Sequence, residues 1–279
     1  SQRGWYGGCV GFLWFNGYAS TGMTLRTIHL EKGLATVRAG ATLLYDSDPV
    51  AEERETRIKA SAFLEATLGQ KASEKLQKPL PRSSGDGKKV VFVDHHDSFV
   101  HTLASYVRQT GAEVTTLRAG FPNHLLEVQK PDLIFLSPGP GQPSEQGVPD
   151  LVGFAVELGV PVFGVCLGHQ GIAEHFGGQL KTLEEPYHGK PSKIVHHGHA
   201  LFSNLPNPFH AGRYHSLYVD RNSLPECLEV TAETNDGVIM GLRHKELPIL
   251  SVQFHPESIL TLREQNGLRL IYKVIDLLT

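Results

Sequence analysis

Short strand-like runs separated by helical stretches dominate the chain after residue 88. The run Val90-Val91-Phe92-Val93 has no polar position. Residues 133–136 and 160–165 repeat the theme, and residues 114–117 do so with two threonines between apolar ends. A strand that is apolar on both sides is buried on both faces of a sheet, as in parallel sheets. Alternation of such strands with helices implies right-handed crossovers. We therefore predict an α/β fold with an open, mostly parallel sheet flanked by helices.

The first 68 residues follow a different pattern. Residues 9–15 are strand-like, residues 24–30 alternate with period two, and Asn16-Gly17 is typical of a hairpin turn. Asp48-Pro49 predicts the start of a helix. Residues 69–88 are polar and rich in Lys, Ser, Pro and Gly, which is a linker composition. We predict a first segment over 1–68, a linker over 69–88 and a domain over 89–279.

Charge and cysteine content argue against several protein classes. The formal net charge is -3 at pH 7, without the basic excess of a nucleic-acid binder. The apolar runs are too short to cross a membrane. Three cysteines without a CxxC pair favour a reducing compartment, so we expect a cytoplasmic protein that contacts neither nucleic acid nor membrane.

The most specific local pattern is an apolar strand that runs into Gly164-Val165-Cys166-Leu167-Gly168 and then into a helix. This pattern is typical of a nucleophile elbow with Cys in the place of Ser. Glycines at 164 and 168 allow a tight turn. The N-terminus of the following helix favours thiolate over thiol. A small buried cysteine in a strand is the alternative interpretation.

A second pattern places a histidine and a glutamate two residues apart after another apolar strand, in Phe254-His255-Pro256-Glu257. A cysteine nucleophile needs a base, and the base needs an acceptor on its other ring nitrogen. The chain has 15 histidines, so this pattern alone would mean little. Together with the elbow, it predicts a triad of Cys166, His255 and Glu257.

A third pattern is the turn Ser137-Pro138-Gly139-Pro140-Gly141, which directly follows an apolar strand. Such a turn places backbone N–H groups in the open, where they can stabilise an oxyanion. An ordinary connection from strand to helix is the alternative, since turns are often rich in Gly and Pro.

In this order and spacing, the three patterns resemble the class I glutamine amidotransferases over most of residues 89–279. The resemblance implies a flavodoxin-like fold in which Cys166 attacks the carboxamide of L-glutamine, His255 transfers the proton and Glu257 orients His255. It also implies an oxyanion hole formed by the amides of Gly139 and Leu167. The implied glutamine-binding positions are Gly139, Pro140, Gly141, Leu167, Gln170, Ser216 and Leu217.

Two further stretches narrow the resemblance. Val93-Asp94-His95-His96-Asp97-Ser98-Phe99 and Pro186-Tyr187-His188-Gly189-Lys190 resemble the glutaminases of anthranilate synthase and aminodeoxychorismate synthase. Relatives usually carry Asn at the position of His95. In having a histidine at this position, the chain resembles the branch of the family in which glutaminase and synthase are fused in one polypeptide.

The N-terminal segment resembles the last part of a chorismate-utilising synthase domain. We therefore expect an incomplete α+β segment, preceded in the parent polypeptide by on the order of several hundred residues. Glu52 and Glu55 lie one helical turn apart and are implied to hold Mg²⁺ with substrate, although a solvated helix start is the alternative. The implied chorismate positions are Tyr6, Arg26, Gly40, Ala41 and Lys59. No cofactor is implied for the glutaminase.

The leading hypothesis is the glutaminase, with a remnant of the synthase, of a fused anthranilate synthase that acts in tryptophan biosynthesis. Its partners would be L-glutamine, chorismate and the remainder of the synthase domain in the same polypeptide. A phenazine-type or aminodeoxychorismate-type synthase with the same parts is one alternative. A docking module without turnover is another, which the three triad residues disfavour. The patterns leave the oligomeric state open, homo-oligomers included.

Overall fold

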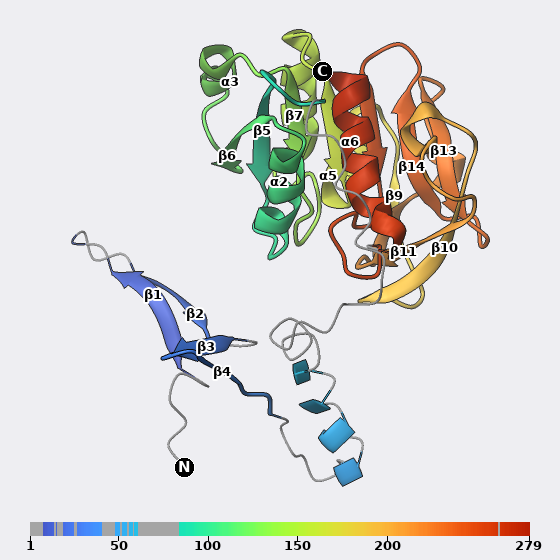
Figure 1. The fold of residues 1–279 in the computed structure, drawn as a ribbon. Coiled ribbons are helices and arrows are strands. Elements are labelled where there is room, and N and C mark those ends of the chain that lie inside the picture. Colours follow the sequence, from blue (N-terminus) through green and yellow to red (C-terminus); the bar gives the residue numbers. More distant parts are fainter. Residues whose placement is uncertain are drawn as a thin grey trace. The chain divides into compact units, whose positions relative to one another are not determined.

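The structure is a computed structural model that describes residues 8–13, 15, 19–24, 27–40, 48–50, 52–54, 56–57, 59–60, 84–261 and 263–279. The chain divides into two compact units, Ser1–Lys78 and Pro79–Thr279 (Figure 1). The division falls inside the stretch predicted as a linker, of which residues 69–83 lie outside the described part.

The described part of the first unit contains two antiparallel hairpins. Strand β1 (Cys9–Leu13) pairs with β2 (Ala19–Met23), and β3 (Ile28–Glu31) pairs with β4 (Leu34–Val37). Lys32 and Gly33 have positive φ angles of 50° and 81°, as a tight hairpin turn requires. The strand expected over 24–30 begins only at Ile28, and β2 was not predicted. The expected Asn16-Gly17 turn lies outside the described residues.

A helix follows the hairpins, as Asp48-Pro49 predicts. The described residues between Pro49 and Ala60 are helical, and the Asp48 carboxylate accepts a hydrogen bond from the Val50 amide at 2.8 Å. This cap satisfies one of the amides that a helix start leaves without a partner.

The hairpins leave large apolar side chains in solvent. On β1, Val10 and Leu13 are 66% and 84% exposed, and on the second hairpin Leu30 and Leu34 are 73% and 69% exposed. Scattered exposed apolar residues are normal, but a two-stranded sheet is stable only when further structure packs on it. The described hairpins therefore do not bury their own apolar surface.

The second unit is built on one sheet, which has nine strands among the described residues (Figure 1). Their order is β11-β10-β13-β14-β15-β8-β7-β5-β6. The last five are parallel: β15 (Ile249–Val252), β8 (Val162–Val165), β7 (Leu133–Leu136), β5 (Lys89–Asp94) and β6 (Glu113–Arg118). Numbered along the chain, their order across the sheet is 2-1-3-4-5, which is flavodoxin-like. The predicted fold class is confirmed.

The remaining strands extend the sheet with antiparallel pairs. They are β14 (Ile239–His244), β13 (Leu228–Thr234), β10 (Lys190–His196) and β11 (Phe209–Arg213). A separate small sheet pairs β9 (Leu180–Thr182) with β12 (Leu217–Val219). Short 3-10 turns occupy η1 (Ala200–Phe202), η2 (Arg221–Ser223) and η3 (Arg263–Gln265).

Helices cover both faces of the parallel strands. On one face, α2 (Val100–Gln109) and α6 (Asn266–Leu278) bury Leu103 and Leu270 in one apolar cluster. On the other face, α3 (His124–Gln129), α4 (Val148–Glu157) and α5 (Leu167–His175) bury Val152 and Ile172 in a second cluster. The result is a three-layer α/β/α arrangement. No described helix combines the length and apolar character that a membrane crossing needs.

The sheet brings the three sequence patterns to one edge. The chain leaves β7, β8 and β15 at their carboxyl ends and enters the 137–141 turn, Cys166 and the segment with His255. In open α/β sheets, ligands bind outside the carboxyl ends of the strands. The topology therefore places all three patterns where such a fold holds its ligand.

The start of α6 packs tightly against the turn after β15. A Cβ atom added at Gly267 would lie 1.8 Å from the carbonyl oxygen of Pro256, a backbone atom that cannot simply rotate away. We expect Gly267→Ala to destabilise the fold by roughly 1–3 kcal/mol, the usual range for overpacking. Urea unfolding followed by circular dichroism measures the effect.

The matched control is Gly153→Ala in α4. Its added Cβ would approach only the ring of His175, at 2.9 Å, and alanine favours a helix over glycine. We expect this variant to be as stable as the wild type or more so. A Gly267→Ala variant that unfolds together with the control would contradict the packing at Pro256.

Candidate active site

Cys166 occupies a strained turn between β8 and α5. Its φ and ψ angles are 52° and -98°, and its side chain is 6% exposed. A positive φ at a residue other than glycine costs on the order of 1–3 kcal/mol and is concentrated at functional sites. The Cys166 amide donates to the Val252 carbonyl at 2.9 Å, which fixes the elbow against β15. The sulfur thus lies at the N-terminus of a helix, where the helix dipole favours an anion.

Two glycines make room for this turn. A Cβ atom at Gly164 would lie 2.6 Å from the carbonyl carbon of Gly168, and one at Gly168 would lie 2.7 Å from the Cβ of Leu136. Real Cβ atoms do not approach other atoms so closely. Helix α5 can therefore pack directly on β8 and β7 only because these two positions lack side chains.

His255 and Glu257 form a buried pair beside the elbow. The Nδ1 atom of His255 lies 2.6 Å from a carboxylate oxygen of Glu257, and the residues are 2% and 4% exposed. Because a carboxylate accepts, Nδ1 donates and Nε2 is left to serve as the base. Nε2 has no hydrogen-bond partner among the other described residues. The backbone of His255 holds the residue in place. Its amide donates to the Gly212 carbonyl at 3.0 Å, and its carbonyl accepts from the Thr261 hydroxyl at 2.6 Å.

The surroundings of His255 favour its protonated form. Burial lowers the pKa of His255, but the Glu257 carboxylate and the Cys166 side chain together raise it well above the usual value. A raised pKa means that the imidazolium persists at neutral pH. The site is thus suited to a thiolate that is paired with an imidazolium, the reactive form of a cysteine nucleophile.

Two aromatic rings enclose His255. The ring of Tyr214 lies 4.9 Å from the imidazole centre, and the ring of Phe99 lies 6.4 Å from it. The Tyr214 hydroxyl lies 3.0 Å from the Ser258 hydroxyl, which follows the pair in the chain. The resemblance to the amidotransferases implied that the 214–217 segment holds the amino-acid end of glutamine, but no pattern placed either ring against His255, because only the folded chain brings the start of α2 and the end of β11 to that histidine.

A second carboxyl group near the pair was also missed. Burial raises the pKa of Asp97, the nearby Glu257 carboxylate raises it further, and His255 acts in the opposite direction. Asp97 also accepts a hydrogen bond from the Phe99 amide at 2.7 Å, just before α2 begins. The motif around residues 93–99 signalled this position, but not its nearness to His255.

The 137–141 turn approaches the elbow closely at Gly139. A Cβ atom there would lie 2.6 Å from the His95 carbonyl oxygen and 2.7 Å from the Leu167 side chain. The His95 amide donates to the Ser137 hydroxyl oxygen at 2.9 Å, which anchors the turn to the end of β5. Leu167 is itself 1% exposed, so only its backbone amide, at the first position of α5, is suited to the predicted oxyanion role.

An open pocket lies beside the sulfur. Its empty volume is about 420 Å³, which includes solvent space at the mouth. The lining residues are Gly139, Pro140, Gly141, Cys166, Gln170, Tyr214, His215, Ser216 and Leu217. Six of the seven predicted glutamine-binding positions therefore surround one cavity with Cys166, and Leu167 lies next to it in the chain.

Gln170 is tied to the opposite wall of this pocket. Its side-chain nitrogen donates to the Leu217 carbonyl at 2.9 Å and to the side-chain oxygen of Gln253 at 3.1 Å. The Ser216 carbonyl accepts a bond from the Leu183 amide at 2.8 Å. Gln170 thus braces the pocket wall as well as lining the cavity.

The predicted synthase residues are only partly described. Tyr6, Arg26, Ala41 and Glu55 lie outside the described residues. Gly40, Glu52 and Lys59 are described in the first unit, with Glu52 and Lys59 on its helix. Within the described ranges, no cluster of three or more His, Cys, Asp or Glu side chains could hold a metal ion. Both the chorismate site and the magnesium site stay predictions.

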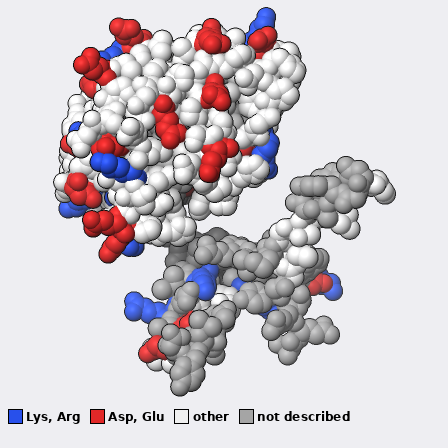
Figure 2. All heavy atoms as spheres, turned by 180° about the vertical axis from the view of Figure 1, so that it is seen from behind, with Lys and Arg blue, Asp and Glu red and all other residues white. Residues whose placement is uncertain are grey.

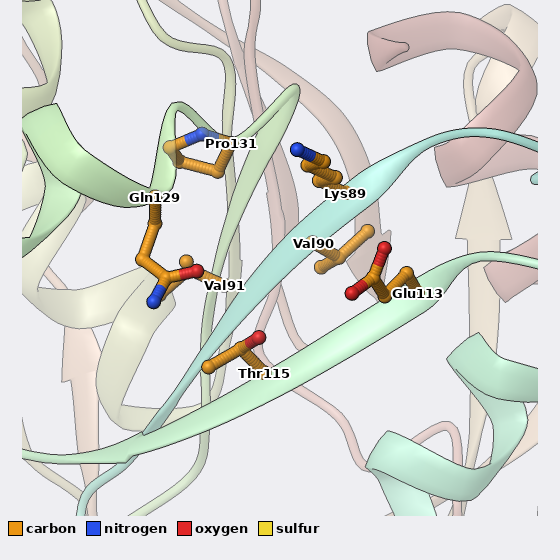
Figure 3. Close-up of a pocket in the computed structure, with 7 residues that line it drawn as sticks. All are labelled: Lys89, Val90, Val91, Glu113, Thr115, Gln129 and Pro131. Carbon is orange, nitrogen blue, oxygen red and sulfur yellow. The ribbon is translucent and has the colours of Figure 1, made fainter.

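Other surfaces of the second unit show no comparable arrangement. Figure 2 shows acidic and basic side chains scattered over one face, where the described Lys and Arg residues form no continuous patch. Figure 3 shows a small hollow at the amino ends of β5 and β6, with Lys89 and Glu113 at its rim and Gln129 and Pro131 beside it. It lies at the opposite end of these strands from the site and shares no residue with the pocket at Cys166.

The chain is similar to curated proteins of known name. It is 53% identical to an anthranilate synthase of Azospirillum brasilense over 99% of this chain, and spans 38% of the length of that relative. It is 47% identical to anthranilate synthase component 2 of the same organism, over 61% of this chain and 88% of the relative.

A solved structure shares the fold of the second unit. It is a GMP synthase subunit protein from Thermoplasma acidophilum, with a TM-score of 0.59 and 25% identity. The match covers 67% of this chain and 94% of the solved chain.

Two protein families match different parts of the chain. Residues 1–65 match the chorismate binding enzyme family. Residues 91–274, which contain the elbow, the buried pair and the pocket, match "Glutamine amidotransferase class-I". The chain therefore belongs to the class I glutamine amidotransferases.

Proposed function

We propose that the chain hydrolyses L-glutamine at Cys166 and supplies the ammonia for the conversion of chorismate to anthranilate in tryptophan biosynthesis. The observation that carries the proposal is the buried His255–Glu257 pair, with 2.6 Å between Nδ1 and the carboxylate, beside a cysteine in a strained elbow. The names of the two Azospirillum relatives support the anthranilate step. A cytoplasmic location belongs to the same proposal.

The residues around the pocket suit each chemical step. The Cys166 thiolate attacks the carboxamide carbon of glutamine, and the backbone amides of Gly139 and Leu167 are suited to bind the oxygen that becomes negative. The His255 imidazolium then donates its proton to the leaving nitrogen, so ammonia departs and a glutamyl thioester remains. Water attacks the thioester with His255 as base, which releases glutamate and restores the thiolate.

Glu257 orients His255 and stabilises its positive charge. Its position on Nδ1 selects the tautomer that presents Nε2 toward the sulfur, as the carboxylate does in serine hydrolases. Because Glu257 does not itself transfer the proton, its contribution is indirect.

The chorismate step would belong to the N-terminal unit and the remainder of the synthase domain. We propose that Tyr6, Arg26, Gly40, Ala41 and Lys59 contact chorismate in the parent enzyme, because residues 1–65 match the chorismate binding enzyme family. Glu52 and Glu55, three positions apart in the sequence, have the oxygen chemistry that Mg²⁺ prefers, and the ion would neutralise the substrate carboxylate.

An aminodeoxychorismate-type synthase is the second candidate. One curated relative, of Bacillus subtilis, is named aminodeoxychorismate/anthranilate synthase component 2 and is 45% identical over 62% of this chain. The two candidates share the glutaminase site and differ only in the product of the synthase. Product analysis of the parent enzyme with chorismate and ammonia separates them.

Cys166→Ala should abolish glutamine hydrolysis, because no other described thiol lines the pocket. The small side chain leaves little cavity, so the fold should be retained. Ammonia release from glutamine measures the loss, and in the parent enzyme free ammonia should still support anthranilate formation. A variant that releases ammonia at a near-native rate would remove Cys166 from the mechanism.

His255→Ala should slow thioester formation by roughly 10²–10⁴-fold, the usual contribution of general acid–base catalysis. Glu257→Gln should be milder, because it keeps His255 in reach of the sulfur. Single-turnover kinetics with glutamine compare the two variants. Equal losses with the fold intact would contradict the division of roles.

The same variant has a pH signature. In the wild type the pKa of His255 is raised, so the imidazolium is lost only as pH rises well beyond the usual range. In Glu257→Gln, burial still lowers the pKa of His255 but the carboxylate no longer raises it. The imidazolium should therefore be lost at a lower pH than in the wild type. A ¹⁵N NMR titration of the His255 ring checks this order, and unchanged midpoints would argue against it.

Glu52→Ala in the parent enzyme should remove Mg²⁺-dependent turnover of chorismate while glutamine hydrolysis continues, because the two sites are separate. Magnesium titration of the ammonia-dependent reaction is the measurement. Glu53→Ala, one position along the same helix, is the control. Full activity of Glu52→Ala at low magnesium would exclude Glu52 as a ligand.

A further inference from the structure

Arg213 is a buried cation behind the glutamine pocket. It ends β11 and is 0% exposed. Its guanidinium carbon lies 3.6 Å from the centre of the Tyr187 ring, and Nη1 donates to the Ser192 hydroxyl at 3.4 Å. Among the described residues, no carboxylate forms an ion pair with it. Burial lowers the pKa of Arg213, and the nearby Tyr187 and the Asp236 carboxylate raise it only in part, so the buried charge is costly to hold.

The guanidinium is bonded to His215, which lines the pocket. Arg213 Nε donates to His215 Nε2 at 2.9 Å, and His215 Nδ1 lies 2.8 Å from the Leu217 carbonyl oxygen. A carbonyl can only accept, so Nδ1 carries the proton and Nε2 is the acceptor. Burial, followed by the positive charge of Arg213, lowers the pKa of His215 to about 3. The ring is therefore neutral and held in a single tautomer.

The Leu217 carbonyl receives a second bond from the elbow helix. Gln170, one turn after Cys166, donates to the same oxygen at 2.9 Å. On the other side of the peptide, the Ser216 carbonyl is held by the Leu183 amide at 2.8 Å. In a trans peptide the N–H points away from the C=O, so the Leu217 amide points away from Leu183. The Leu217 carbonyl is thus held by two side chains that line the pocket, and the Ser216 carbonyl by a backbone amide that does not.

We propose that Arg213 and His215 are positioning residues for the substrate: the pair holds the Leu217 carbonyl, and with it the Ser216–Leu217 backbone, where the amino-acid end of glutamine binds. The inference rests on the proposed function, because it assumes that glutamine occupies this pocket. Neither side chain takes part in the chemistry at Cys166.

The geometry explains why an arginine stands at this position. Its flat guanidinium stacks on Tyr187 while Nε donates in the same plane to His215, and lysine cannot do both. The backbone of the same strand is bonded to the 187–189 turn, through Tyr187 N to His215 O at 3.1 Å and Gly189 N to Arg213 O at 3.0 Å. The stack and the hydrogen bonds thus fasten one turn and one pocket wall to each other.

The test separates recognition of glutamine from reactivity of the thiol. Two reagents are compared on the 279-residue chain with Cys9 and Cys227 replaced by Ser, so that Cys166 is the thiol that reacts. One is a diazoketone analogue of glutamine, which must first bind the pocket, and the other is iodoacetamide, which need not. The variants are Arg213→Met, His215→Gln and His215→Asn. An asparagine amide reaches the place of Nδ1 and can still donate to Leu217, whereas a glutamine amide reaches only the place of Nε2.

We expect Arg213→Met and His215→Gln to raise the half-saturating concentration of the analogue by several-fold to about tenfold, the usual effect of losing one buried hydrogen bond. The rate with iodoacetamide should stay unchanged, and His215→Asn should restore most of the affinity. His244→Asn is the control, since His244 caps a loop through bonds from the Glu246 and Leu247 amides. It should behave as the wild type with both reagents.

Three results would overturn the inference. Unchanged saturation by the analogue in folded His215→Gln would show that the pair does not position the wall. A parallel fall in the iodoacetamide rate would show general damage at the elbow instead. Equal losses in His215→Asn and His215→Gln would exclude the bond to Leu217 as the cause. If Arg213→Met does not fold, the two His215 variants decide.

One further result would also bear on the proposed function. If the wild type reacts with the analogue without saturation, the pocket does not bind glutamine, and the proposed function fails together with this inference. Saturable labelling of the wild type with unaltered labelling of the variants would leave the proposed function standing alone.

Discussion

The strained backbone at Cys166 depends on how two strands of the sheet pair. The Cys166 amide is bonded to the carbonyl of Val252, the last residue of β15, and β8 and β15 are paired in parallel so that Val165 lies beside Val252. His255 follows β15 by three residues, and the register therefore determines how far the imidazole lies from the sulfur. A shift by one residue would turn every side chain of β15 to the other face and remove the base from the nucleophile.

Within this frame, one carboxylate distinguishes histidines that are otherwise alike. His95, His169, His215 and His255 are all buried in the second unit. Burial lowers the pKa of His95 to about 4 and those of His169 and His215 to about 3, so these three are neutral at physiological pH. Only His255 has a carboxylate on its ring nitrogen, and its pKa moves in the opposite direction. The same fold thus holds three structural imidazoles and one proton donor.

Sequence reasoning works best where chemistry and turn geometry are encoded locally. The elbow, the His255–Glu257 spacing and the glycine turn at 139–141 are short patterns, and the structure places their residues around one pocket or directly beside it. The apolar runs at 90–93, 133–136 and 160–165 likewise identify parallel strands, because strands buried on both faces have few polar positions.

The features that the sequence could not predict depend on contacts between residues far apart in the chain. Tyr214 and Phe99 meet at His255 only after α2 and β11 pack, and the order β11-β10-β13-β14 follows from tertiary contacts that no local pattern records. The first unit was harder still: residues 24–30 alternate with period two, but β3 begins only at Ile28 and Leu30 lies in solvent, so the alternation reports no buried face.

Strand β15 stands at the junction between the two halves of the sheet, parallel to β8 on one side and antiparallel to β14 on the other. In the order of synthesis, the chain makes Cys166 first and completes strands β9 to β14 before β15 and His255 appear. The nucleophile and its base therefore cannot meet until the last strand is inserted in the middle of the sheet. During synthesis the site therefore cannot form before residue 257 has been added, and a shorter chain carries the cysteine without its histidine and glutamate.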